Sequence, residues 1–340
     1  MQMPGSTLQV FLRHPRYAML LLLVLVPSIY LLLPFRPDPP LIPLRIAPNE
    51  LTDVAYRMAQ AEALYQKTIL DRTGLISRYG PHPSDIDMFP PNKSPWPAYT
   101  VWDYFPASFN CPYEVRRVGS LSDGGKWVCG LSRLVDKKDC VIYSVGINHE
   151  SSFEADLLVN TNYCKVWGYD ASVKGFAKQI PYTERYRTTF HRYALGHVDR
   201  PASGSESVMY TLKTLMQMNG TAFPLLKCAP WDLLRAHCIH LDAGHQHIDI
   251  LKVDLEGWEF DAITNMIKSF VTQDLPLPFG QLLLEIHVWD KNFEYLLKWW
   301  EGLEEAGLRP FWNAPNLVYV NYAGSRKPEL AEVSDDFRIL

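Results

Sequence analysis

The sequence predicts an α/β fold built around a parallel sheet. From Cys111 onward, apolar runs of strand length alternate with helical patterns, as expected when a helix connects each strand to the next. The clearest run, residues 248–253, has the β-branched and leucine content of a strand buried on both faces. It stops at Asp254, Glu256 and Gly257, and a helical pattern follows. Ligands of open α/β sheets bind at this carboxyl edge.

Other runs extend the alternation on both sides of the central strand. The remaining expected strands are residues 141–145, 165–169, 188–193, 281–286, 309–312 and 317–321. The expected helices are residues 49–72, 152–158, 172–180, 209–218, 258–267 and 293–306. His287 follows the strand at 281–286, so we expect it on the same sheet edge as Asp254.

Composition limits the classes of protein that fit. At 340 residues the chain is long enough for one large core with appendages, and its 47% hydrophobic content is ordinary for a globular protein. A formal charge of −4 and a pI near 6.2 argue against a nucleic-acid partner, which calls for a basic face.

The N-terminus carries a membrane signal. An uncharged apolar run of 17 residues extends from Tyr17 to Leu33, with Arg13 and Arg16 before it. This length is at the lower limit for crossing a hydrocarbon core of about 30 Å. A cleaved signal peptide is the alternative, but the P-F-R-P sequence that follows offers no small-residue cleavage site. We therefore expect a single-pass type II membrane protein of the Golgi or endoplasmic reticulum.

The expected organisation has four parts. Residues 1–16 form a cytosolic tail, 17–34 a signal anchor, 35–110 a proline-rich linker with a stem helix, and 111–340 the main domain. The 26 prolines are concentrated before residue 113. We expect the helix at 49–72 to pack against the main domain, because three heptads are too few to indicate a coiled coil.

Two expected strands that precede residues 248–253 in the sequence also end in features of a ligand site. Gly146 ends the strand at 141–145, where a glycine lets a ligand approach the backbone. The S-S-F-E run at 151–154 predicts a capping box for the next helix. Asp170 follows Gly146 by 24 positions, near the offset at which nucleotide-binding folds place a carboxylate on a ribose. The alternative role for Asp170 is N-cap of the helix at 172–180.

Asp254, Glu256 and His287 are the candidate catalytic residues. They offer two carboxylates and an imidazole as a base for a hydroxyl acceptor. The same three side chains are a reasonable ligand set for a divalent ion that activates the acceptor. The structural alternative is that the carboxylates only cap the following helix and that His287 is a structural hydrogen-bonding residue.

Five sequence runs together resemble a known family: C-V-I-Y-S-V-G-I at 140–147, V-W-G-Y-D at 166–170, I-D-I-L-K-V-D-L-E-G-W-E at 248–259, L-L-L-E-I-H at 282–287 and D-G-G-K-W-V-C at 123–129. Over residues 111–322 the chain resembles the family of methyltransferase-like protein 24 and, more distantly, the FkbM-type methyltransferases. The resemblance implies a Rossmann-like, seven-stranded class I methyltransferase sheet that binds S-adenosylmethionine.

By this resemblance, Gly146 and the loop after it hold the methionine end of the cofactor and Asp170 holds its ribose. Asp254 lies beside the sulfonium and the acceptor. The implied cofactor-binding residues are Gly146, Ile147, Glu150, Asp170, Leu195 and Asp254.

The function expected from these features is a membrane-anchored, S-adenosylmethionine-dependent methyltransferase of the secretory pathway. Its acceptor is unknown, and a hydroxyl on a glycan or a small molecule fits the candidate residues. One alternative is a Golgi-type glycosyltransferase that uses Asp254 and Glu256 as a metal-binding pair. The other is a catalytically silent scaffold with a methyltransferase fold.

A lumenal domain would be exposed to oxidation and glycosylation. We expect disulfides Cys111–Cys129 and Cys228–Cys238, and buried free thiols at Cys140 and Cys164. The N-G-T sequon predicts a glycan on Asn219, and the sequon at Asn92 is poorer because a proline follows it.

Overall fold

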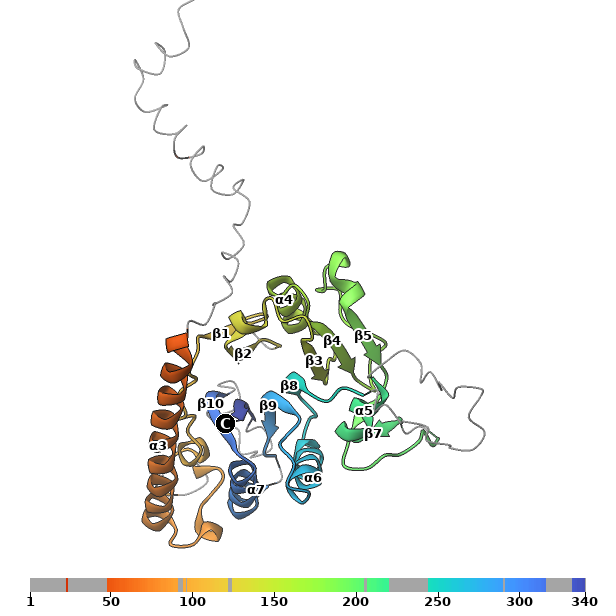
Figure 1. Cartoon of the computed structure of the whole chain (residues 1–340). Coiled ribbons are helices and arrows are strands. Elements are labelled where there is room, and N and C mark those ends of the chain that lie inside the picture. The colour runs from red at the N-terminus through yellow and green to blue at the C-terminus, as the bar shows by residue number, and fades with distance from the viewer. Residues whose placement is uncertain are drawn as a thin grey trace, which may run out of the picture. The chain divides into compact units, whose positions relative to one another are not determined.

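The computed structural model (Figure 1) describes residue 23 and residues 48–90, 94–95, 97–121, 124–204, 207–219, 244–289, 291–315 and 332–339. Ile42–Leu340 forms one compact unit. The structure therefore groups the helix and the aromatic segment before residue 111 with the domain that follows.

A mostly parallel sheet lies at the centre of this unit (Figure 1). Its seven strands are ordered β10-β11-β9-β8-β3-β4-β5, and β11 is antiparallel to both of its neighbours. The strands are β3 Val141–Val145, β4 Lys165–Tyr169, β5 Thr188–His191, β8 Ile248–Val253, β9 Phe279–His287, β10 Leu308–Pro315 and β11 Glu332–Ile339. Counted along the chain, the first five strands are ordered 3-2-1-4-5, which is the doubly wound arrangement. The α/β class is confirmed.

Two small sheets accompany the central one. An antiparallel hairpin pairs β1 Val115–Val118 with β2 Lys126–Cys129, and a short parallel pair joins β6 Ala194–Leu195 to β7 Met209–Tyr210. The described part of the chain therefore contains eleven named strands rather than seven, although the main sheet has seven. The last strand expected from the sequence, residues 317–321, lies outside the described residues, and β11 completes the described sheet.

Five α-helices are described: α3 Pro48–Tyr79, α4 Ser152–Asn160, α5 Leu212–Met218, α6 Glu259–Val271 and α7 Phe293–Glu305. The prediction of a helix at 172–180 is wrong. Asp170 accepts hydrogen bonds from the backbone N and the hydroxyl of Ser172, which fixes a local turn where a helix would begin. The expected helix at 49–72 continues to Tyr79 and stops at Gly80 and Pro81, which favour termination.

Helix α3 packs against α7, as expected for the stem helix. The Arg72 guanidinium lies 2.6 Å from the Glu304 carboxylate, and both side chains are buried. The Tyr65 hydroxyl donates to the same carboxylate at 2.5 Å. Arg309, at the start of β10, pairs with Glu62 at 2.9 Å. These long-range ion pairs fix the helix to the domain.

Among the described residues, no helix combines the length and apolar character needed to span a membrane. The expected anchor at 17–34 lies outside the described residues apart from Leu23, and so do Cys228 and Cys238.

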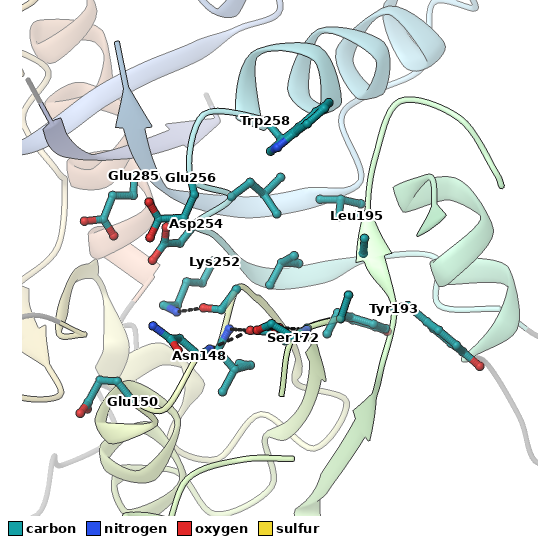
Figure 2. Close-up of a pocket in the computed structure, with 18 of the residues that line it drawn as sticks. Asn148, Glu150, Ser172, Tyr193, Leu195, Lys252, Asp254, Glu256, Trp258 and Glu285 are labelled. Atoms are coloured by element: carbon teal, nitrogen blue, oxygen red, sulfur yellow. Dashed lines mark hydrogen bonds between the residues drawn. The ribbon is translucent and has the colours of Figure 1, made fainter. Parts of the chain in front are cut away.

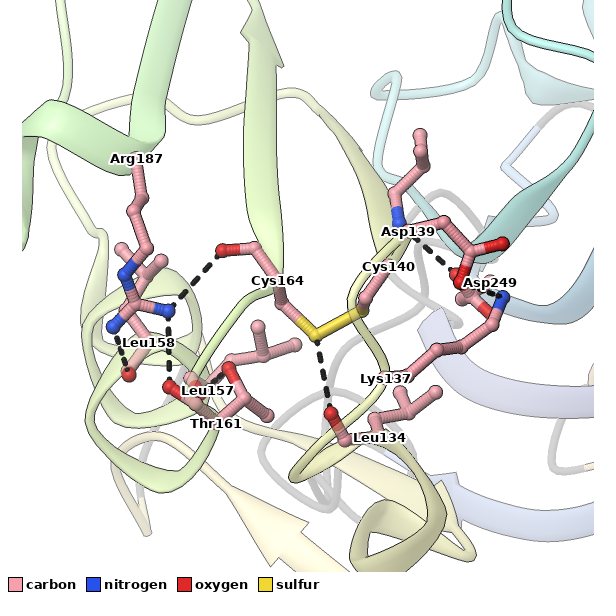
Figure 3. The surroundings of a disulfide bond; sticks show 11 residues. Leu134, Lys137, Asp139, Cys140, Leu157, Leu158, Thr161, Cys164, Arg187 and Asp249 are labelled. Atoms are coloured by element: carbon pink, nitrogen blue, oxygen red, sulfur yellow. Dashed lines mark hydrogen bonds and ion pairs between the residues drawn. A yellow bond between two sulfur atoms is a disulfide. The ribbon is translucent and has the colours of Figure 1, made fainter.

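The two described disulfides correct part of the cysteine assignment. Cys111–Cys129 is present as expected, but Cys140 and Cys164 are also disulfide-bonded rather than free thiols (Figure 3). Each of these two residues directly precedes one of the neighbouring parallel strands β3 and β4, which pair Val141 with Lys165. Their Cα atoms are consequently 4.4 Å apart, a separation that a disulfide can bridge.

Asn219 is in a position that does not suit a glycan. Its side-chain nitrogen, the atom that would carry the sugar, donates to the hydroxyls of Tyr143, at 3.0 Å, and Tyr169. Both tyrosine side chains are fully buried. A sugar on this nitrogen would displace at least one of these hydroxyls, so the structure argues against glycosylation of the folded chain at Asn219.

We predict that replacing both Cys140 and Cys164 by serine lowers the free energy of unfolding by about 3 kcal/mol, because the loop they close is then unconstrained in the unfolded chain. Urea denaturation of the parent and the double variant measures this change. Alkylation of the denatured, unreduced parent is the control. Labelling of Cys140 and Cys164 without reduction would show free thiols and contradict the disulfide.

Candidate functional site

A cavity of ≈ 560 Å³ opens at the carboxyl edge of the sheet (Figure 2). Strands β3 and β8 are neighbours there, and their connections run to opposite sides, so this is the switch point of the doubly wound order. All eight residues assigned from the sequence to catalysis or cofactor binding line this one cavity: Gly146, Ile147, Glu150, Asp170, Leu195, Asp254, Glu256 and His287. Their individual roles stay predictions.

Gly146 and Asp254 bring the tips of the two strands together. Gly146 has φ +75°, and a Cβ atom built on it would lie 1.8 Å from the carbonyl oxygen of Asp254. The Asp254 backbone N also donates to the Val145 carbonyl at 3.1 Å. A side chain at 146 would therefore force the two strand tips apart. The missing side chain at Gly146, which we expected to let a ligand approach the backbone, also lets the neighbouring strand approach it.

Asp170 fixes the loop that follows β3. One of its oxygens accepts from the backbone N of Ile147 at 2.9 Å and of Asn148 at 2.7 Å. The other accepts from the N and the hydroxyl of Ser172. Burial by itself raises the pKa of Asp170, but these hydrogen bonds outweigh it and hold the pKa below its usual value. A ribose bound by Asp170 would have to share these acceptor positions.

The capping box expected at 151–154 does not form. Glu154 is fully buried and instead accepts a hydrogen bond from the Ser144 hydroxyl. Ser152 N donates to Glu150 at 2.8 Å, and Gln179 donates to the other Glu150 oxygen at 2.8 Å. Glu150 is therefore fixed at the beginning of α4, on the side of the cavity formed by the β3 loop.

Asp254 is an acid of the cavity whose pKa is strongly perturbed. Its Oδ1 atom is buried and has no hydrogen-bond partner among the described residues. Burial raises the pKa of Asp254 to about 7, and the neighbouring Glu285 carboxylate adds to the rise while Lys252 and Lys126 oppose it. A buried carboxylate oxygen without a donor is costly, and it occurs most often where a ligand or a reaction uses it.

Glu256 and His287 lie beside Asp254. Asp254, Glu256 and His287 each offer one ligand atom, and these three atoms all lie within 4.8 Å of one another. His287 Nε2 is 3.8 Å from Glu256 Oε2, and Nδ1 is 3.1 Å from Glu259 Oε1. Glu256 has φ +50°, a strained conformation for a residue other than glycine.

The capping explanation does not fit this arrangement. Helix α6 begins only at Glu259, and Trp258 is its N-cap residue. The buried Glu259 accepts from the backbone N of Gly257 at 2.9 Å and of His287 at 2.6 Å. Glu259 therefore holds the turn at the helix start, which leaves the Asp254 and Glu256 carboxylates facing the cavity.

Sequence reasoning missed the charged residues that support the site. Lys126 and Glu285 form a buried ion pair with a 2.8 Å separation between β2 and β9. Lys252 is buried in β8, where its Nζ donates to the Gly146 carbonyl at 3.0 Å and lies 3.9 Å from Glu154. A signal existed, because a charged residue inside an apolar strand is rarely buried without a partner.

The two ends of the cavity differ in character (Figure 2). Asp254, Glu256 and Glu285 lie toward one end, and Tyr193 and Leu195 toward the other. Trp258 also lines the cavity but is 63% exposed. The cavity thus offers an apolar wall at one end and three carboxylates, with Lys126 paired to Glu285, at the other.

Comparison with known proteins places the chain in a family. A family model described as "Methyltransferase domain" matches residues 75–322. The chain belongs to this methyltransferase family. It is 24% identical over 216 residues to "Probable methyltransferase-like protein 24" of Homo sapiens, covering 61% of this chain and 49% of that protein. The protein of the same name from Rattus norvegicus is also 24% identical, with 50% of its length covered. The chain thus spans about half the length of these curated relatives.

Membership in a methyltransferase family suggests a cofactor of the S-adenosylmethionine type, and the cavity fits one. The buried, unpartnered Oδ1 of Asp254 suits the positive charge of a sulfonium. The apolar wall at Leu195 suits an adenine ring, since ligand sites combine apolar walls with a few placed polar groups. Asp170 lines the same cavity.

We predict that Asp170→Ala lowers the free energy of unfolding by about 1–3 kcal/mol, since the backbone amides of Ile147 and Asn148 lose their acceptor. It should also weaken S-adenosylhomocysteine binding, because the loop is no longer fixed. Chemical denaturation and calorimetry measure the two effects.

Asp199→Ala is the matched control, because Asp199 likewise accepts from a backbone N, that of Thr211, but does not line the cavity. It should cost stability without changing ligand affinity. Unchanged affinity in Asp170→Ala would remove Asp170 from the cofactor site.

Proposed function

We propose that this protein transfers the methyl group of S-adenosylmethionine to an acceptor hydroxyl. The observation that carries the proposal is the position of Asp254: its unpartnered, buried carboxylate oxygen lies at the switch point of a doubly wound sheet, in the same cavity as the loop after β3. The family match supports methyl transfer over the glycosyltransferase alternative.

The residues of the cavity divide into two groups. The backbone of the Gly146–Asn148 loop and the carboxylate of Asp170 would bind and orient the cofactor at the β3 and β4 side. The apolar side chain of Leu195 would pack against its adenine. Because such a loop is shaped by hydrogen bonds already formed in the described structure, little ordering is needed when the cofactor binds.

S-adenosylmethionine, when bound, supplies a methyl group on a positively charged sulfur. Alignment of the acceptor oxygen with the methyl carbon then accounts for most of the rate that the protein can add. A hydroxyl acceptor must also lose a proton. Asp254, Glu256 and His287 are the groups of the acidic end that can accept a proton or lower the pKa of the hydroxyl.

We further propose that the domain works in the lumen of the Golgi or endoplasmic reticulum, as a type II membrane protein anchored through residues 17–34. The uncharged apolar run and its flanking arginines support this orientation. The two disulfides support it as well, because disulfides persist in oxidising compartments and are rare in the cytosol. The acceptor would then be a hydroxyl carried by a glycan or a small molecule of that compartment.

Substitution of Ala171 by tryptophan tests the cofactor site. Ala171 lines the cavity directly after Asp170, so a bulky side chain there would occupy cofactor space. We expect at least a tenfold loss of S-adenosylhomocysteine affinity by calorimetry, corresponding to about 1.4 kcal/mol.

Ala59→Trp provides the matched control, since Ala59 is exposed on α3 and outside the cavity. It should bind like the parent, and both variants should keep the parent's melting temperature. If the parent binds no S-adenosylhomocysteine, or Ala171→Trp binds it equally well, the proposed cofactor site is wrong.

A further inference from the structure

We propose that Asp254, Glu256 and His287 bind one divalent metal ion next to the cofactor position. The proposal rests on the proposed function for the role of the ion, and on the geometry of the three side chains for the existence of the site. Two carboxylates and one imidazole are a ligand set that suits Mn²⁺ or a similar first-row ion.

The distances permit a shared ion after a small adjustment. The three ligand atoms lie within 4.8 Å of one another. Two ligands at about 2.2 Å from one ion are at most about 4.4 Å apart. Glu256 can close the difference, because its side chain is 73% exposed and not held by the core.

His287 is arranged as metal-ligating histidines are. Its Nδ1 lies 3.1 Å from the Oε1 atom of Glu259, whose side chain is fully buried. A carboxylate at Nδ1 fixes the tautomer and directs Nε2 away from it, here toward Glu256. His287 is itself only 2% exposed, so its orientation is set by packing rather than by solvent.

Asp254 gives a reason for a cation in addition to the spacing of the three side chains. Its Oδ1 atom is buried without a hydrogen-bond partner among the described residues. The two lysines whose charge acts on Asp254 also have other partners: Lys126 pairs with Glu285, and Lys252 donates to the Gly146 carbonyl. A divalent ion would give the buried oxygen a partner and balance the charge of the two carboxylates.

The ion would lower the pKa of an acceptor hydroxyl held beside it, as bound metal ions do for water. In the transfer, the hydroxyl proton goes to solvent, the new bond forms between oxygen and the methyl carbon, and the bond between that carbon and sulfur breaks. Its electron pair stays on sulfur. No oxidant or reductant is needed.

The test is Mn²⁺ binding to the full-length chain. A chelator first removes bound metals, and binding is then measured as a decrease in the electron paramagnetic resonance signal of free Mn²⁺. We expect one saturable site, and at least tenfold weaker binding in Asp254→Asn. Asp261→Asn is the matched control, because it removes the same charge from an exposed position in the first turn of α6. Absence of a saturable site, or equal affinity in Asp254→Asn and the parent, would overturn the proposal.

Glu259→Gln tests the positioning of His287. It keeps a hydrogen-bonding side chain of the same size, and we expect Mn²⁺ affinity to fall 10- to 100-fold, as is typical when the residue that orients a ligand is changed. If this variant does not fold, His287→Gln replaces it with the same expected loss. Parent-like Mn²⁺ affinity in the folded variant would show that the imidazole is not a ligand.

Calorimetry with S-adenosylhomocysteine on the same samples separates this inference from the proposed function. Binding of the cofactor product without Mn²⁺ binding would overturn the metal site alone. If the protein binds Mn²⁺ but does not bind S-adenosylhomocysteine, the metal site is supported and the cofactor assignment is overturned. Release of Mn²⁺ on addition of S-adenosylhomocysteine would also overturn the proposal, since it would place both in one position.

Discussion

The close approach of Gly146 to Asp254 is the constraint on which the site depends. Because nothing larger than hydrogen fits at 146, the tips of β3 and β8 can lie against each other at the switch point. The loop after β3 and the acidic turn after β8 then face the same cavity. A side chain at 146 would separate these two parts, and neither alone makes a site for a cofactor and an acceptor.

Buried charges keep this junction in shape. Lys252 reaches from β8 to the Gly146 carbonyl, and Glu259 joins the turn after β8 to the end of β9. Each such group is expensive to bury and is tolerated only with its partners in place. The supporting charges therefore hold the turn after β8 against the ends of β3 and β9 before any ligand arrives.

Local sequence patterns predicted most of the strands but not the contacts between them. The runs that became β4 and β8 were predicted with their observed bounds, because β-branched, leucine and aromatic residues dominate both runs and each run ends at an acidic residue. The last strand, β11, has the polar sequence E-V-S-D-D-F-R-I and carries no such pattern. The Cys140–Cys164 bond was predictable in principle from the pairing of β3 with β4, which the sequence alone did not specify.

The candidate residues could be found from the sequence because the strand ends of a parallel sheet share one edge. What each residue does depends on backbone geometry that the sequence does not reveal. Asp170 illustrates this: its carboxylate binds the loop after β3, a contact that no spacing rule contains. The partner of Glu259 was equally hidden, because His287 is 28 positions away in the chain.

A crystal structure with S-adenosylhomocysteine tests the central claim most directly. We expect the ligand's sulfur beside Asp254, its ribose at Asp170 and its adenine toward Leu195. Ligand density elsewhere on the protein, with the cavity between β3 and β8 unchanged, would contradict the account.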